Sequence, residues 1–144
     1  MKKYNKMQKY LSSLAVINAK LHNLHWNVEG KEFVPVHEFT ESLYDDFFEK
    51  MDVVAEMMKM KKEMPLVKME DYVENSVIEE LSAKSFGCEE VLKIVEEDLK
   101  KMKKLATEIR EEADDDGDFE VVAEMEDHVA GYSKHLWFLR SMLA

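Results

Sequence analysis

The apolar residues of this 144-residue chain recur at intervals of three, four and seven, which is the period of helices with one buried face. The first such stripe predicts a helix from about Lys3 to Val28 that is ended by Gly30. Asn18 and His25 fall on the same stripe, and polar residues on an apolar face need hydrogen-bond partners. The apolar members of the stripe are Met7, Leu11, Leu14, Leu21 and Val28.

Three further long helices follow from the same period. They are expected from near Pro35 to just before Pro65, over about Glu89–Ala113, and over about Phe119–Leu143. The connection Leu66–Leu81 is a crossover that includes one or two helical turns over Met69–Asn75. So long a connection indicates that the helices it joins are not simple hairpin neighbours. A bundle with one long crossover is one of the known topologies of four-helix bundles.

The composition agrees with this helical pattern. Glycine (4) and proline (2) are too scarce for the frequent turns of a β-sandwich or barrel. Apolar residues make up 46% of the chain, which is enough to bury a core and argues against disorder. These features predict an all-α protein that forms a single domain over residues 1–144.

The charge balance narrows the classes of partner. The chain has 31 acidic and 20 basic residues and a formal net charge of −11, so its average surface repels phosphate backbones and attracts cations. Cys88 is the only cysteine, which excludes a disulfide within the chain. No segment approaches the ~20 apolar residues of a membrane span, and no apolar signal segment follows the basic N-terminus. We expect a soluble cytoplasmic protein with no membrane partner.

Motifs for most kinds of catalysis are missing. The sequence has no zinc-finger Cys–His pattern, nucleophile elbow, glycine-rich phosphate loop or His-Glu-x-x-His motif. The Glu-x-x-His motif of di-iron helical bundles is also absent, because no histidine has a glutamate three residues before it. A conventional di-iron centre inside the bundle is therefore not expected.

Histidines and carboxylates nevertheless form two candidate half-sites. A tight turn brings His25, near the end of the first helix, close to His37 at the start of the second. Glu41 lies one turn after His37 on the same face. Further along the same helix, Asp52 and Glu56 form a carboxylate pair at positions i and i+4. The first half-site thus offers two imidazoles and a carboxylate, and the second offers two carboxylates.

The spacing of these half-sites excludes a shared metal within one chain. Asp52 follows His37 by fifteen residues, which places the two on roughly the same helix face but about 22 Å apart along the axis. If the second helix packs antiparallel against its own copy across a two-fold axis, the histidines of one chain meet the carboxylates of the other. Mixed imidazole and carboxylate ligands suit Fe(II), Zn or Mn.

Structural interpretations of the same residues stay open from spacing alone. His25 fits a hydrogen-bonded core residue, and His37 after a proline fits a capping or surface residue. Asp52 and Glu56 fit solvated carboxylates or partners of Lys59. The remaining histidines are expected to be structural or surface residues, and these are His22, His128 and His135.

The residues around the half-sites resemble the signature of the Dps family, the mini-ferritins of the ferritin superfamily. The resemblance is carried by LHWNVEG at positions 24–30, Phe33, VHE at 36–38, LYD at 43–45 and MDVVAE at 51–56. It extends through Pro65 to Glu79 and Glu80, and to KHLW at positions 134–137. It therefore covers nearly the whole chain.

This resemblance implies a ferritin-like four-helix bundle with a short helix in the crossover, assembled into a hollow dodecamer. It implies a ferroxidase site at the two-fold interface, with His25 and His37 from one chain and Asp52 and Glu56 from its partner. Glu41 falls where many members place a further carboxylate for the second iron, although aspartate is common there. Trp26 falls beside the site, where family members are thought to pass an electron; packing at the interface is the alternative role.

The family's chemistry implies a mini-ferritin that protects the cell from oxidative stress. Fe(II) would be oxidised, with hydrogen peroxide as the usual oxidant, and Fe(III) would be stored in the shell. The acidic residues Asp114, Asp118 and Glu120 resemble in position those lining an iron-uptake pore, and a solvated acidic loop is the other interpretation. Zinc is the other metal we consider for the site as purified.

DNA binding, the family's other activity, is expected to be weak or absent. Members that bind DNA usually use a mobile, lysine-rich terminal extension, whereas here the first helix starts close to Lys2 and Lys3 and the last helix ends near Ala144. The alternative function is a structural or DNA-compacting shell with a degenerate or non-iron metal site. The intact set of histidines and carboxylates favours the ferroxidase.

Overall fold

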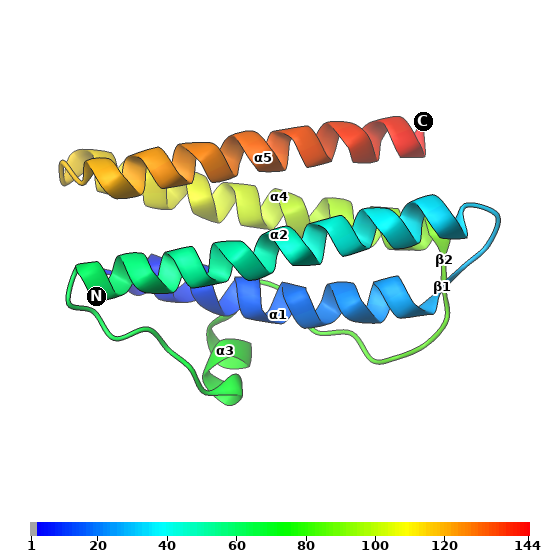
Figure 1. Cartoon of the computed structure of the whole chain (residues 1–144), viewed down its shortest axis with the longest axis horizontal. Coiled ribbons are helices and arrows are strands. Elements are labelled where there is room, and N and C mark those ends of the chain that lie inside the picture. Colours follow the sequence, from blue (N-terminus) through cyan, green and yellow to red (C-terminus); the bar gives the residue numbers. More distant parts are fainter. Residues whose placement is uncertain (1–2) are drawn as a thin grey trace.

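A computed structural model describes residues 3–144, which form an all-α bundle of four long helices and one short one (Figure 1). The predicted fold class and the short helix in the crossover are confirmed. In chain order the elements are α1 (Asn5–Asn27), β1 (Val28–Glu29), α2 (Phe33–Met60), α3 (Met69–Asn75), β2 (Phe86–Gly87), α4 (Cys88–Asp115) and α5 (Phe119–Leu143). Among the described residues, no helix is long and apolar enough to cross a membrane. Lys2, which entered the expectation on DNA binding, lies outside the described residues.

The long helices form two antiparallel pairs. Helices α1 and α2 pack against each other, as do α4 and α5, and α1 also contacts α4 (Figure 1). The short α3 packs on α1, on the side of the bundle away from α5. The crossover carries the chain from the end of α2 past α3 to the opposite end of the bundle, as its length required.

The apolar stripes read from the sequence form the core. The apolar positions predicted for the first stripe are all buried, and Leu14 among them is fully inaccessible, as is Leu99 on α4. Asn18 has the partner that its position demanded, since its side-chain amide donates to the main-chain oxygen of Tyr44 at 2.9 Å. The predicted N-terminus of the second helix was two residues late: α2 starts at Phe33, and Pro35 occupies the first turn, where a missing N–H costs no helical bond.

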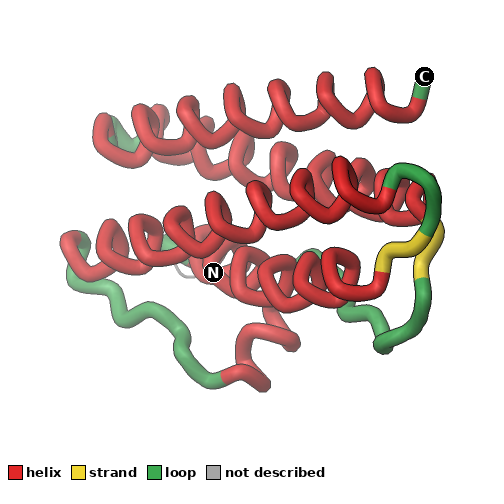
Figure 2. Tube along the Cα trace, turned by 45° about the vertical axis from the view of Figure 1, so that its right-hand side comes forward, coloured by secondary structure: helices red, strands yellow, loops and turns green. Residues whose placement is uncertain are grey.

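A short parallel bridge holds the α1–α2 turn in place, and no sequence pattern predicted it. Val28 pairs with Phe86 and Glu29 with Gly87, which fastens the turn to the start of α4 (Figure 2). Gly30 beside it has φ 135°, and a Cβ there would lie 3.1 Å from the sulfur of half-buried Cys88. The backbone conformation therefore favours glycine, and the nearby sulfur leaves little room for a side chain.

Candidate metal centre

His25 and His37 lie face to face where α1 ends and α2 begins. Their ring centroids are 3.6 Å apart and their planes are inclined by only 14°. His25 is almost fully buried and His37 is half-buried. The turn fixed by the β1–β2 bridge brings these residues together across a separation of twelve positions. The proximity that the sequence suggested is thus present in the fold.

Main-chain hydrogen bonds fix which nitrogen of each ring is free. His25 Nδ1 lies 2.6 Å from the main-chain oxygen of His37, and His37 Nδ1 lies 2.8 Å from the main-chain oxygen of His25. A carbonyl oxygen only accepts, so each Nδ1 carries the hydrogen and donates it. Each Nε2 is then left with a lone pair, which is the form in which histidine binds a metal.

The electrostatic environment keeps His25 in its neutral form. Burial is the largest influence and lowers the pKa of His25; the hydrogen bond to the His37 main chain raises this pKa, and the neighbouring His37 ring lowers it. The carboxylate of Glu41 acts in the opposite direction, with Oε1 3.7 Å from His25 Nε2. Because only a neutral imidazole can donate a lone pair, the depressed pKa favours metal binding at neutral pH.

Glu41 is the carboxylate nearest to this pair and the candidate for a third metal ligand. Its side chain is 55% exposed, so it can turn towards a cation beside the imidazoles. The hydroxyl of Tyr44 donates to Glu41 Oε1 at 3.5 Å, and the Tyr44 ring meets the His25 ring edge-on at 5.2 Å. Tyr44 therefore supports both a candidate ligand and the ring behind it.

Asp52 and Glu56 lie far from this pair. Both are exposed near the other end of α2, and Asp52 lines a surface groove together with apolar side chains of α1, α2 and α3. Across residues 3–144 no group of three or more histidine, cysteine, aspartate or glutamate side chains is arranged to hold a metal ion. One chain thus presents two incomplete sets of donors.

Exposed apolar side chains flank both half-sites. Trp26 is 68% exposed next to His25, and Phe33 stacks on His37 with ring centroids 4.9 Å apart. Phe48, 67% exposed, lies one turn before Asp52 and lines the same groove. Large exposed apolar side chains beside incomplete sets of metal ligands are typical of a surface that another chain covers.

The other histidines have structural surroundings. His22 bonds through Nδ1 to the main-chain oxygen of Asn18 at 2.7 Å and stacks on Tyr44 at 3.8 Å. His128 is buried between a phenol and a carboxylate: Nδ1 lies 2.7 Å from Tyr10 Oη, and Nε2 lies 2.9 Å from Glu124 Oε2. His135 is partly exposed, 3.9 Å from a carboxylate oxygen of α2.

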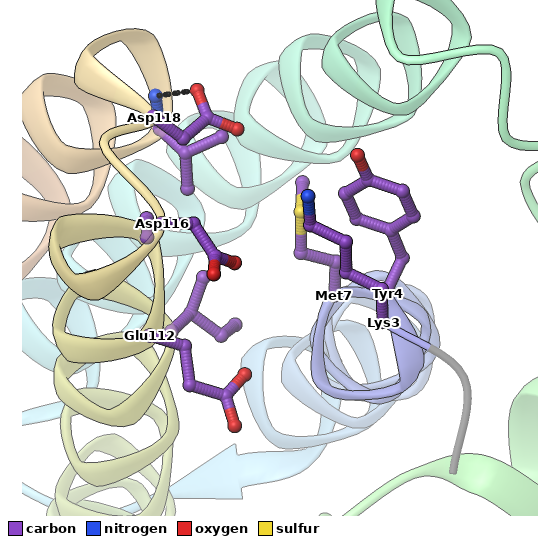
Figure 3. Close-up of a pocket in the computed structure, with 9 residues that line it drawn as sticks. Lys3, Tyr4, Met7, Glu112, Asp116 and Asp118 are labelled. Carbon is purple, nitrogen blue, oxygen red and sulfur yellow. Dashed lines mark hydrogen bonds between the residues drawn. The ribbon is translucent and has the colours of Figure 1, made fainter.

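The acidic residues considered for an iron-uptake pore already have basic partners within the chain. Asp118 lies 2.9 Å from Lys61 Nζ and also caps α5, because its side chain accepts from the main-chain N–H of Val121 (Figure 3). Glu120 lies 3.4 Å from the same ammonium, and Asp114 lies 3.5 Å from Arg110 Nη1. These ion pairs reduce the negative charge that is available to attract cations. The iron-uptake pore stays a prediction.

A second feature of this end of the bundle is a small pocket at the α4–α5 turn. Figure 3 shows Glu112, Asp116 and Asp118 on one side of it and Lys3 and Tyr4 from the chain's start on the other. Asp114 and Glu120 do not line this pocket. The acidic run therefore does not converge on one point within a single chain.

Thr40 is a supporting residue that sequence reasoning missed. Its hydroxyl is fully buried, 3.1 Å from His25 Nδ1 and 3.0 Å from the main-chain oxygen of His37. The signal that could have found it is a polar residue on the buried face of α2, one turn after His37. Residues of this kind orient metal-binding imidazoles in many proteins.

Comparison with known proteins agrees with this fold. A family model described as a ferritin-like domain matches residues 4–144. The chain is 31% identical to a DNA protection during starvation protein of Helicobacter pylori over 144 residues, which is all of both chains. It is 32% identical to the protein of that name from Brevibacillus brevis, covering 95% of this chain and 91% of that one. The crystal structure of Helicobacter cinaedi CAIP superposes with a TM-score of 0.95 at 35% identity, covering 99% of this chain and all of that one.

Proposed function

Because the chain belongs to the Dps family of ferritin-like proteins, a membership that supports a mini-ferritin role in stress protection, we propose that it is a ferroxidase that stores iron. The observation that carries this proposal is the stacked pair His25 and His37, with both Nδ1 atoms bonded to main-chain oxygens and both Nε2 atoms free. Histidines that bind a metal through one ring nitrogen commonly donate the other ring N–H to a main-chain oxygen, as both rings do here.

The complete site is proposed to form between two copies of the chain. His25 and His37 of one copy would bind Fe(II) together with Asp52 and Glu56 of the other, and Glu41 would help to hold a second, weaker iron. The 22 Å or so along α2 between the two half-sites prevents one chain from supplying both. The exposed Trp26 and Phe48 beside the half-sites provide apolar area for such an interface.

Fe(II) is the substrate of the proposed reaction, and hydrogen peroxide is the proposed oxidant. Two Fe(II) ions each give up one electron, the O–O bond of the peroxide breaks, and two protons complete two molecules of water. Carboxylates are hard donors and stabilise Fe(III) over Fe(II), so they favour the oxidised product. Paired oxidation avoids one-electron cleavage of peroxide, which would release hydroxyl radical. This is the basis proposed for the protective role.

The proposed assembly is the family's hollow dodecamer, in which Fe(III) would collect. With subunits of 16.9 kDa it would have a mass of about 200 kDa. The protein can be loaded anaerobically with Fe(II), treated with peroxide and passed through a sizing column with iron detection. Iron that co-elutes with a particle of that mass supports the proposal. A particle without iron argues against storage, and a small iron-free species argues against the shared site.

A double variant tests the residues. His25→Ala/His37→Ala should slow peroxide-dependent oxidation of Fe(II) by about 100-fold or more while the particle size stays unchanged. The matched control is His135→Ala, which removes a partly exposed imidazole of α5 outside both half-sites. Unchanged oxidation by the double variant would show that the site lies elsewhere.

A further inference from the structure

The structure brings lysines from two distant parts of the sequence to one groove. Lys6 and Lys9 of α1 line it on one side, and Lys101 and Lys104 of α4 line the other, together with one carboxylate of α4, that of Glu108. Leu105, which is 6% exposed, forms part of its floor. The sequence itself shows four lysines at positions 100–104, but only the fold places two of them opposite Lys6 and Lys9.

Most of these ammonium groups are not neutralised. Lys6 is paired with Glu112 at 3.0 Å and with Glu108 at 3.8 Å. Lys9, Lys101 and Lys104, in contrast, have no carboxylate within 4.0 Å anywhere in residues 3–144. Asp98, whose charge interacts with that of Lys101, is already bonded to Lys20 at 2.7 Å.

Like charges held together between two packed helices repel each other. The repulsion is relieved when an anion lies among them, and a concave site with an apolar floor strengthens that attraction by limiting screening water. The groove is therefore complementary to an anion that carries several negative charges.

The surrounding charges limit the size of this anion. Along α4 the lysines span positions 100–104, which is about 6 Å of helix. Acidic residues bound this stretch on both sides, with Glu96, Glu97 and Asp98 before it and Glu108, Glu111 and Glu112 after it. A nucleic-acid duplex carries one charge per ~1.7 Å over a much longer footprint and would meet these carboxylates. A compact anion held by Lys9, Lys101 and Lys104 would meet only Glu108, which also lines the groove and lies 3.8 Å from Lys6 Nζ.

We propose that the groove between α1 and α4, lined by Lys6, Lys9, Lys101 and Lys104, binds a compact multiply charged phosphate anion of the inorganic oligophosphate class. This site is separate from the histidines and carboxylates of the proposed ferroxidase site. It does not depend on iron chemistry, so it can be tested whether or not the chain oxidises iron.

The probe is sodium tripolyphosphate, titrated calorimetrically into the assembled protein at low salt and without divalent metal. Binding should weaken by about tenfold or more in Lys101→Gln/Lys104→Gln, because two positive charges of the groove are lost. Both side chains are exposed and unpaired, so the substitutions should not disturb folding. The matched control is Lys93→Gln/Lys100→Gln, which makes the same change in charge on the same helix at residues already paired with carboxylates. Its affinity should stay within about twofold of the parent.

Three results would overturn the proposal. The first is no heat of binding at millimolar tripolyphosphate. The second is an equal loss of affinity in the two double variants, since that would mean diffuse attraction to surface lysines. The third comes from a parallel titration with a short DNA duplex: if the duplex binds more tightly than tripolyphosphate and loses affinity in the groove variant alone, the occupant is nucleic acid and not a compact anion.

Discussion

His25 and His37 orient each other, because the Nδ1 of each is bonded to the main-chain oxygen of the other, at 2.6 and 2.8 Å. The two bonds join the end of α1 to the start of α2, so the positions of the rings follow from the backbone and not from flexible side chains. A site held in this way is rigid before any metal arrives, and it loses little entropy when a metal binds.

Thr40 should tune this arrangement. In Thr40→Val the shape is kept but the hydroxyl beside His25 Nδ1 is lost, while the bond from His25 to the His37 main chain remains. We expect Fe(II) oxidation to slow several-fold at low iron, with a stability loss of about 1 kcal/mol. Stopped-flow absorbance measures the rate. The control is Thr107→Val, which removes a similar hydroxyl on α4, and equal rates in the two variants would rule out a role for Thr40.

The buried ion pair between Lys20 and Asp98 gives a prediction about stability. Both side chains are less than a tenth exposed and lie 2.7 Å apart, and burial is the largest influence on Asp98, whose pKa it raises. Lys20→Met should lower the free energy of unfolding by about 3 kcal/mol, because it leaves a buried carboxylate without a partner.

Two comparisons check this interpretation by urea denaturation. The double variant Lys20→Met/Asp98→Leu should recover most of the loss, because neither charge is then buried. Lys93→Met removes an exposed partner of Glu89 and should change stability by less than about 0.5 kcal/mol. A double variant as unstable as the single one would show that packing, and not the unpaired charge, is responsible.

The buried His128 should make the fold sensitive to mild acid. Burial is the largest influence and lowers its pKa below the ordinary value near 6.5, so the unfolded chain binds this proton more readily than the folded one. The contribution of His128 to the free energy of unfolding is therefore fully present above about pH 6.5. It falls as the pH drops below that value, by at most ~1.4 kcal/mol per pH unit. The charged and titratable groups that act on the ring are Tyr10, Lys50, Glu124 and Asp127, and Tyr10 is in turn bonded to Tyr132.

Urea midpoints between pH 7 and pH 5 measure this effect. His128→Gln should have a shallower dependence on pH than the parent, and His135→Gln, which changes a partly exposed ring, should not. The carboxyl of Asp46 titrates outside this pH range, because its pKa is lowered to about 2 despite partial burial; it is bonded to Lys50 at 2.6 Å and lies 3.9 Å from His135 Nε2. Identical slopes in the parent and in His128→Gln would contradict the prediction.

The helices could be predicted from sequence because their signals are local. Helix α5 has the predicted bounds Phe119–Leu143, and it is capped by the side chain of Asp118, a residue type that commonly caps helix N-termini. The end of α2 was harder to predict from the sequence, because the left-handed conformation after it, with φ 64°, is adopted by Lys62 and not by a glycine. The bridge between Val28 and Phe86 joins residues far apart in sequence and has no local signature.

In the candidate site, too, some features follow from local sequence and others depend on how the helices pack. The proximity of His25 and His37 could be anticipated, since a short turn joins neighbouring helix ends, but the stacking of their rings could not. The separation of Asp52 from His37 follows from helix geometry alone. The support from Thr40 and Tyr44 could not be anticipated, because it depends on how the two helices are rotated against each other. The groove between Lys9 and Lys101 depends on the packing of α1 against α4, which sequence periodicity does not define.

The central claim is that each site takes histidines from one chain and carboxylates from another, and mixed assembly tests it most directly. One variant, His25→Ala/His37→Ala, keeps only the carboxylate half, and the other, Asp52→Asn/Glu56→Gln, keeps only the histidine half. Each should be inactive alone. When the two are co-expressed with separable tags and assemble at random, about a quarter of the sites should combine both intact halves. Recovery of about a quarter of the parent's ferroxidase rate in the mixed particle is the predicted result. A mixed particle as inactive as its components would contradict the shared site.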